Sequence, residues 1–214
     1  SPDGEVVEKG GAAQGLRTTY ATSQAARKVY TCLACAANTN LSTNAASQFT
    51  SANSALTTTT LGVATATERD NLINWVRGAD NASDEAGPGG AVTVRPSAHG
   101  DVLHSRPAVV NYGGTTGVVV FYGANDGMLH AVNGNQTGTG AGRELWGLIL
   151  QEQASKLRRL RTNSPPVRLS TTVVGASTSE FTPQPRDYFV DGPIEIYQKI
   201  SSSGSTQRAI LYAT

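Results

Sequence analysis

The chain contains the run Val118-Val-Val-Phe-Tyr-Gly-Ala-Asn-Asp-Gly-Met-Leu-His-Ala-Val132, which predicts two strands joined by a tight turn. The block from Val118 to Tyr122 is β-branched and aromatic, as is typical of a buried strand. Asn125-Asp-Gly127 predicts the turn, because Asx side chains bond the backbone ahead of them and glycine accepts positive φ. Met128 to Val132 then returns as the antiparallel partner.

Further strands are expected on both sides of this pair. Ser105-Arg-Pro-Ala-Val-Val-Asn-Tyr112 precedes it, and Glu144-Leu-Trp-Gly-Leu-Ile149 follows a second turn signal at Asn133-Gly-Asn135. Short antiparallel strands joined in this way by tight turns form one blade of a β-propeller. The expected fold class is therefore all-β with one or two short helices, as part of a β-propeller that this chain leaves incomplete.

The blade is similar to the repeat of quinoprotein-like propellers, in which an Asp-Gly turn, a Leu-x-Ala strand and a Gly-x-Glu-x-Trp closure recur. Here the closure is Gly142-Arg-Glu-Leu-Trp146. More narrowly, the segments Gly100–Val110 and Phe121–Ala131 resemble the C-terminal propeller of the PilC/PilY family of type IV pilus biogenesis factors and tip-associated adhesins. Other segments match that family in the same order: Glu5–Gln14, Arg27–Thr31, Trp75–Gly78 and Tyr188–Gly192.

This resemblance implies an extracellular, pilus-associated protein that is exported through the periplasm. Such a protein would support pilus assembly, surface attachment and twitching motility, with the propeller acting as a binding platform and not as an enzyme. The implied partners are the rest of the propeller or parent polypeptide, minor pilins at the pilus tip, and a host or abiotic surface.

A quinoprotein dehydrogenase is the alternative, because the blades of these enzymes share the same sequence repeat. Those enzymes are recognised by an adjacent Cys-Cys pair over the pyrroloquinoline quinone cofactor and by calcium-liganding acidic and amide residues. This chain has Cys32-x-x-Cys35 and lacks that constellation. No cofactor is therefore expected in this chain, and similarity of fold alone does not carry function.

Charge and hydropathy argue against a nucleic-acid-binding protein, a protein that binds anionic membranes and a membrane-spanning protein. The 214 residues include 17 Lys and Arg against 16 Asp and Glu, so the charge favours neither nucleic acid nor an anionic membrane as a partner. No apolar run approaches the roughly 20 residues that span a bilayer. The first residues show no secretion leader and are expected to lie inside a longer polypeptide.

Two segments are expected along the chain. Residues 1–90 form an N-terminal part of the propeller with a Thr/Ser/Asn-rich insertion and a short helix, and residues 91–214 form one complete blade and the start of the next. Ile194–Ile200 and Gln207–Thr214 are the expected strands of that next blade. Because closure needs four to eight blades of about 40–50 residues, the chain is expected to be a piece of a larger propeller.

The N-terminal segment contains one clear helix signal and one unusual loop. Thr67 to Gly78 predicts a helix with Thr67 as its N-cap, whereas residues 5–31 are expected to form short extended segments. No charged residue occurs from position 29 to position 67. This part is either a surface loop pinned by apolar anchors or an adhesive loop that presents hydroxyls and amides, and the anchors are Leu41, Phe49, Leu56 and Leu61.

Cys32 and Cys35 are the only cysteines. A structural zinc site normally takes four protein ligands, and the chain offers only this pair and three scattered histidines, so a zinc site is not favoured. A thioredoxin-like redox pair is not favoured either, because it requires a following helix that the sequence does not indicate. In an exported protein a small disulfide loop with a local structural role is favoured over free thiols.

The candidate site residues have both structural and functional interpretations. Asp126 is a weak candidate for a calcium ligand, but capping its turn is favoured, with Gly127 and Trp146 as further structural residues. The PilC/PilY family carries an EF-hand-like calcium loop, which this chain lacks, so calcium would be bound beyond Thr214 in the full-length protein. Asp101 and His104 precede the expected innermost strand, where they would line the central channel or bond neighbouring blades.

Overall fold

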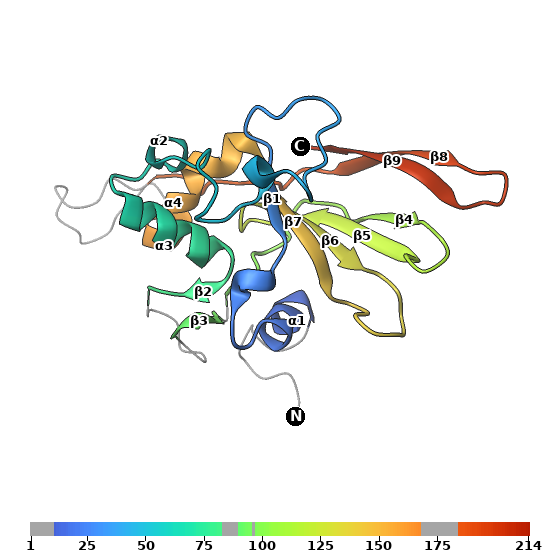
Figure 1. Ribbon diagram of the computed structural model, residues 1–214, viewed down its shortest axis with the longest axis horizontal. Coiled ribbons are helices and arrows are strands. Elements are labelled where there is room, and N and C mark those ends of the chain that lie inside the picture. Colours follow the sequence, from blue (N-terminus) through green and yellow to red (C-terminus); the bar gives the residue numbers. More distant parts are fainter. Residues whose placement is uncertain (1–10, 83–89, 96, 168–183) are drawn as a thin grey trace.

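The computed structural model describes residues 11–82, 90–95, 97–167 and 184–214 (Figure 1). The chain is mainly β-sheet with short helices, which confirms the expected all-β class at this level. Helices are more numerous than expected, because the described residues include four α-helices where one or two were predicted. Part of the family match at Glu5–Gln14 lies outside the described residues.

The main sheet has five strands in the order β1-β7-β6-β5-β4. Its last four strands pair antiparallel with their neighbours and follow the chain as a simple meander, as the sequence predicted. These strands are β4 (Ala108–Asn111), β5 (Val118–Gly123), β6 (Met128–Asn133) and β7 (Glu144–Ile149).

The register of β5 and β6 places different side chains on the two faces of the sheet. Phe121 lies opposite Ala131, and Tyr122 lies opposite His130. Because successive side chains of a strand alternate between faces, one face carries Val119, Phe121, Leu129 and Ala131, and we call it the hairpin face. The other carries Val120, Tyr122, Met128 and His130, and we call it the network face.

The fifth strand comes from the N-terminal segment. β1 (Val29–Thr31) pairs parallel with β7, with Val29 opposite Gly147 and Tyr30 opposite Leu148. The strand falls at the end of the segment 5–31, where short extended stretches were expected, whereas its parallel partner lies more than a hundred residues away in sequence. The first segment therefore contributes directly to the sheet of the second.

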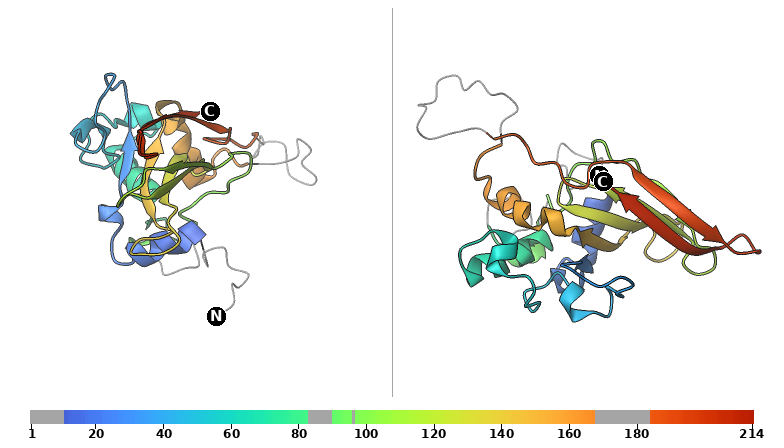
Figure 2. Two further views of the ribbon diagram at one scale, coloured as in Figure 1. Left: turned by 90° about the vertical axis from the view of Figure 1, so that its right-hand side faces the viewer. Right: turned by 90° about the horizontal axis from the view of Figure 1, so that it is seen from above.

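A separate hairpin covers the hairpin face. β8 (Ile194–Ile200) and β9 (Thr206–Ala213) form this antiparallel pair and lie alongside β4 and β5 (Figure 2). Ile194 is buried against Val110 and Phe121, and Ile196 and Leu211 pack on the same cluster. The two strands predicted for the next repeat are thus stacked on the first four-stranded meander.

Short helices pack at one end of the sheet, on the left of Figure 1. They share an apolar core with Met128 and Ile149, in which Phe49, Leu56 and Leu61 are fully buried. Leu41 is only half-buried, so three of the four expected anchors reach this core. The elements are α2 (Thr58–Leu61), α3 (Ala66–Val76), η3 (Gln151–Lys156) and α4 (Leu157–Thr162). A further short helix, η2 (Ala45–Ser47), lies in the loop before Phe49.

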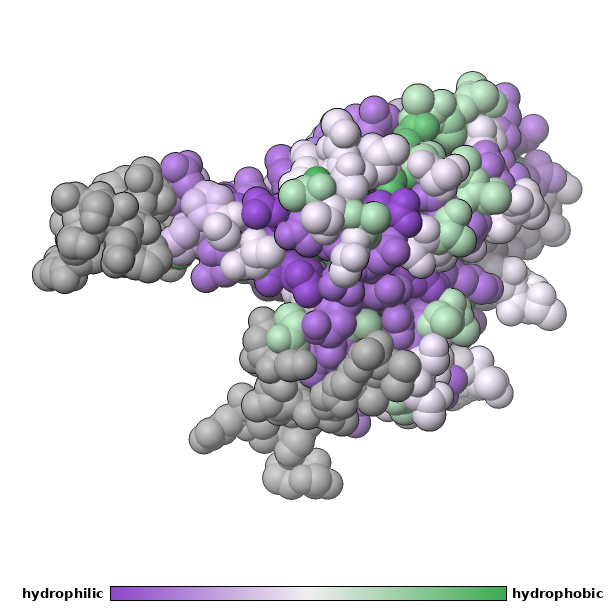
Figure 3. Space-filling view, turned by 60° about the vertical axis from the view of Figure 1, so that its left-hand side comes forward, coloured by the Kyte–Doolittle hydropathy of each residue, from purple (hydrophilic) through white to green (hydrophobic). Residues whose placement is uncertain are grey.

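The outer surface of this helical end is mostly hydrophilic. Figure 3 shows hydrophilic residues across its centre, with apolar residues in smaller patches toward one edge.

The remaining described elements are α1 (Gly11–Thr19), η1 (Gln24–Ala26), β2 (Ala79–Asp80) and β3 (Gly90–Val94).

Two local predictions were wrong. The N-cap of α3 is Thr65, not Thr67: its hydroxyl accepts the N–H of Glu68 at 3.1 Å, and the Glu68 carboxylate accepts the Thr65 N–H at 3.2 Å. This reciprocal capping box requires a glutamate or glutamine three residues after the cap. Glu68 stands in that position relative to Thr65, whereas Asp70 stands there relative to Thr67. The segment expected to be extended forms helix α1, because alanines and Leu16 outweigh its glycines and Leu16 is buried.

Candidate functional site

The turn between β5 and β6 is closed by Asp126. Its Oδ1 accepts the backbone N–H of Met128 at 3.1 Å, and its Oδ2 accepts the N–H of Gly100 at 3.0 Å. Gly127 has a φ of +97°, and a Cβ at this position would lie 2.5 Å from Leu157. The aspartate therefore joins the turn to the preceding loop, and only glycine fits beside it without strain.

His130 lies between two carboxylates on the network face. Its Nε2 is 3.0 Å from Asp126 Oδ2, and its Nδ1 is 2.8 Å from Glu144 Oε2. Each ring nitrogen can bond an ionised carboxylate only by donating, so the imidazole carries both protons and a positive charge. The His130 side chain is fully buried.

Arg27 completes the group from the other side of Glu144. The guanidinium binds the carboxylate in two places, Nε to Oε1 at 2.8 Å and Nη2 to Oε2 at 2.9 Å. Its Nη1 donates to the carbonyls of Val76 and Arg77 at the end of α3. We call Arg27, Glu144, His130 and Asp126 the buried ion network. Its two cations and two anions balance.

The pKa values in the buried ion network reflect this pairing. Burial lowers the pKa of His130, but the charges and hydrogen bonds of Asp126 and Glu144 outweigh it and raise the pKa to about 9. Burial likewise raises the pKa of both carboxyl groups, yet their cationic partners hold them well below their usual range. All members are therefore charged at neutral pH.

Two further polar side chains extend the network on the same face. The His99 ring stacks on His130 with 4.6 Å between centroids, and its Nε2 is 2.8 Å from the Tyr122 hydroxyl. Burial and the adjacent His130 cation lower the pKa of His99, so it is neutral beside the charged ring. Burial and the neighbouring carboxylates raise the pKa of Tyr122.

The buried ion network is closed to solvent. Arg27 is 2% exposed, His130 0% and Asp126 8%. Its members come from the segment before β1, from the β5–β6 turn and from strands β6 and β7, and Arg27 also binds the end of α3. The arrangement fixes these elements to one another and leaves no member open to a substrate.

Asp101 and His104 lie on the surface beside the segment that leads into β8. Asp101 pairs with Arg186, and His104 Nδ1 is 2.5 Å from Asp191 Oδ2. The His104 side chain is 71% exposed. The neighbouring Ser105 hydroxyl accepts the N–H of Gly123 at 2.9 Å, so it makes its hydrogen bond away from the histidine.

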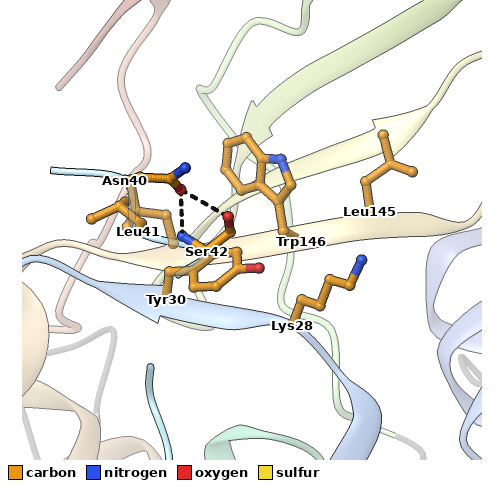
Figure 4. A pocket seen from close by; sticks show the side chains of 8 residues that line it. Lys28, Tyr30, Asn40, Leu41, Ser42, Leu145 and Trp146 are labelled. Atoms are coloured by element: carbon orange, nitrogen blue, oxygen red, sulfur yellow. Dashed lines mark hydrogen bonds between the residues drawn. The ribbon is translucent and has the colours of Figure 1, made fainter. Parts of the chain in front are cut away.

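Trp146 lies on the hairpin face of β7, beyond the part that β8 and β9 cover. Its ring is tilted against Phe121 with 5.8 Å between centroids, and its exposed edge lines a groove of about 420 Å³. We call this cavity the β1–β7 groove (Figure 4). The other residues that line it come from both strands and from the uncharged loop: Lys28, Tyr30, Asn40, Leu41, Ser42, Leu145 and Leu148.

Cys32 and Cys35 are joined by a disulfide immediately after β1. The bond closes a small loop directly after the strand. Within the described ranges, no group of three or more His, Cys, Asp or Glu side chains is arranged to hold a metal ion. Asp126 directs its oxygens to backbone amides and to His130.

Sequence reasoning singled out Asp126 and Trp146 but missed Arg27, Glu144 and His130 as a group. One signal was available: the register of the predicted hairpin places His130 beside Tyr122 on a face that must be buried. A histidine at such a position requires polar partners. The sequence does not reveal which carboxylate and which arginine supply them.

The comparisons with known proteins identify no relative. No family model, curated protein or solved structure matches the chain. Among the described residues, no helix is long and apolar enough to cross a membrane.

Proposed function

We propose that this chain is part of a quinoprotein-like β-propeller in a protein similar to the PilC/PilY pilus biogenesis factors and tip adhesins. In this proposal β4 to β7 form one complete blade, and β8 and β9 are the first two strands of the next. The protein acts outside the cell at type IV pili, where it supports pilus assembly, attachment and twitching motility.

The stacking of the β8–β9 hairpin on the meander is the observation that supports this proposal. Neighbouring blades of a propeller pack face to face, and each buries the apolar face of the one before it. Ile194, Ile196 and Leu211 pack in this way against a cluster that includes Val110 and Phe121. The order of strands along the chain is also the one that successive blades require.

The proposed role is that of a binding platform and not of an enzyme. The buried charged side chains of the network face are paired with one another in the buried ion network. Its geometry supports a structural role, because it connects the N-terminal segment to β6 and β7. The proposed partners are the remaining blades, minor pilins and the surface to which the pilus attaches. Any calcium would be bound by other parts of the parent protein.

Deletion of the gene in the source organism tests the pilus role. Sheared surface pili, twitching zones and adherent cells are measured in the deletion strain and after complementation with the unaltered gene. We expect piliation and twitching to fall together and to recover on complementation. Normal piliation, twitching and attachment in the deletion strain would contradict the proposal. Dye reduction by the purified protein with an alcohol and pyrroloquinoline quinone would instead favour a dehydrogenase.

A further inference from the structure

The β1–β7 groove combines an aromatic surface with polar groups along its rim. The parallel register places Val29 opposite Gly147 and Tyr30 opposite Leu148, so Lys28, directly before β1, comes next to Trp146 on β7. Since residues two apart in a strand share a face, all four side chains rise on the same side of the sheet. Figure 4 shows Tyr30 and Trp146 beside the Asn40–Ser42 loop, with Lys28 on the far side of Tyr30 from that loop.

The polar groups of this groove are held in place and remain available to a ligand. Asn40 Oδ1 accepts both the backbone N–H of Ser42 at 3.1 Å and its hydroxyl at 2.8 Å. This local bonding fixes the loop, and among the residues that the structure describes the amide nitrogen of Asn40 donates no hydrogen bond. Lys28 is exposed, and within the described part of the chain its ammonium forms no ion pair.

We propose that the β1–β7 groove binds a sugar residue that carries a carboxylate, such as a uronic or sialic acid at the end of a glycan. The C–H face of a pyranose ring can lie against the exposed parts of Trp146 and Tyr30. Its hydroxyls can bond Asn40 and Ser42, and its carboxylate can pair with Lys28. Aromatic side chains with a few placed polar groups are the usual composition of small-ligand sites.

The size and charge of the groove favour this ligand over an apolar one. A volume of about 420 Å³ falls within the range of roughly 300–1,000 Å³ typical of ligand pockets. An apolar peptide side chain would cover Trp146 and Leu148 but would leave the Lys28 ammonium and the Asn40 amide without partners, which weakens binding when they are desolvated. A carboxylated sugar satisfies both the aromatic and the polar parts.

This inference names the ligand class for the attachment role and rests on the proposed function for its biological use only. Binding of the sugar by the protein is a separate property. Saccharide binding would therefore persist even if deletion of the gene left pili and attachment unchanged, in which case the proposed function fails and this inference stands.

Saturation-transfer difference NMR on the intact protein tests the binding. The probes are methyl galacturonide and N-acetylneuraminic acid, with methyl galactoside as the neutral match of the first. We expect the galacturonide to bind at least about threefold more tightly than the galactoside, as an exposed ion pair would supply. The Lys28→Gln variant should lose this difference, whereas the exposed Lys199→Gln variant should keep it.

A second pair of variants tests the aromatic surface. Tyr30→Ala should weaken binding of the galacturonide and of the neutral galactoside alike, by roughly tenfold, while Tyr212→Ala on the outer face of β9 should not change it. Circular dichroism of each variant checks that the fold is retained. Absence of any saccharide signal, equal binding of acid and neutral sugar, or unchanged binding in Lys28→Gln would each overturn the inference.

Discussion

At the scale of single residues, His130 shows how a buried charge is tolerated on a face that must be apolar. Its ring is fully buried between Asp126 and Glu144, and Arg27 binds the far side of Glu144. Burial of an ion costs several kcal/mol unless partners and hydrogen bonds compensate it. The compensation here depends on every member, because each carboxylate serves at least one cation.

Removal of one charge from the buried ion network should therefore lower the free energy of unfolding strongly. Glu144→Gln keeps the size of the side chain but leaves Arg27 with no carboxylate partner in the network. We expect the free energy of unfolding to fall by about 3–5 kcal/mol, the range for breaking a buried pair. Urea unfolding followed by circular dichroism measures the loss. Glu195→Gln, on the exposed face of β8, is the matched control and should stay within about 0.5 kcal/mol.

The same group makes stability depend on pH on the alkaline side. The pKa of His130 rises from an ordinary value of about 6.5 in the unfolded chain to about 9 in the fold. A group with a raised pKa stabilises the fold fully below its unfolded pKa, and this contribution is lost as pH rises through the folded value. Stability should therefore decline between about pH 6.5 and 9.

Urea unfolding at half-unit steps from pH 6 to 10 measures this decline. His130→Gln should be less stable at pH 6 and should show a flatter curve above it. His99 does not produce the decline, because its pKa is lowered and its contribution changes below about 6.5. An alkaline slope that is identical in His130→Gln would contradict the assignment.

Sequence could predict the turn that Asp126 closes but not the partners of His130. The Asn-Asp-Gly pattern specifies a local structure, and Asp126 bonds Met128 two residues along. The Arg27–Glu144 pair, in contrast, joins positions 117 residues apart. It exists only because β1 pairs with β7, and short-range patterns carry no information about that pairing.

At the scale of elements, the strands of the meander were predicted well and the helices less so. The continuous β-branched and aromatic block of β5 is typical of a buried strand, and the Asn-Asp-Gly turn marks where β5 ends and β6 begins. The helix α1 was missed because its glycines indicated breaks, whereas burial of Leu16 stabilises it through tertiary contacts. Local propensity is a weak guide where packing decides.

The N-cap of α3 allows a test with a built-in control. Thr65→Ala removes the hydroxyl that accepts the Glu68 N–H and should lower the free energy of unfolding by about 1 kcal/mol. Thr67→Ala alters an exposed residue inside the first turn, where alanine is a better helix former, and should be neutral or slightly stabilising. Thermal unfolding of both variants compares them. A larger loss for Thr67→Ala would mean that the helix begins elsewhere.

At the scale of the whole molecule, the two larger apolar clusters of the described residues lie on opposite sides of one sheet. One lies among the helices around Met128 and Ile149, and the other lies beneath the β8–β9 hairpin around Phe121. The sequence predicted an incomplete set of blades, which would expose apolar sheet faces. In the structure the β8–β9 hairpin covers the hairpin face instead. The sequence could not predict that the N-terminal segment supplies β1, since that segment indicated only short extended stretches.

The hairpin should be held mainly by its packing on the sheet, because an isolated two-stranded hairpin is marginal in water. Ile196 and Tyr197 are adjacent on β8 but face opposite ways: Ile196 packs on the hairpin-face cluster, whereas Tyr197 is 60% exposed. Ile196→Asp places a charge against that cluster and should release the hairpin. Tyr197→Asp introduces the same charged side chain on the solvent side of β8 and should leave the hairpin docked.

Hydrogen exchange measured by mass spectrometry distinguishes these outcomes. In Ile196→Asp we expect faster exchange in β8 and β9 and in the edge strand β4, with increased binding of an apolar dye to the uncovered face. The segment of α3 should keep its protection, because its core lies on the other side of the sheet. If Tyr197→Asp released the hairpin equally, the outer face of β8 would be the one that holds it. The stacking of successive strand pairs, on which the propeller proposal depends, would then lose its physical basis.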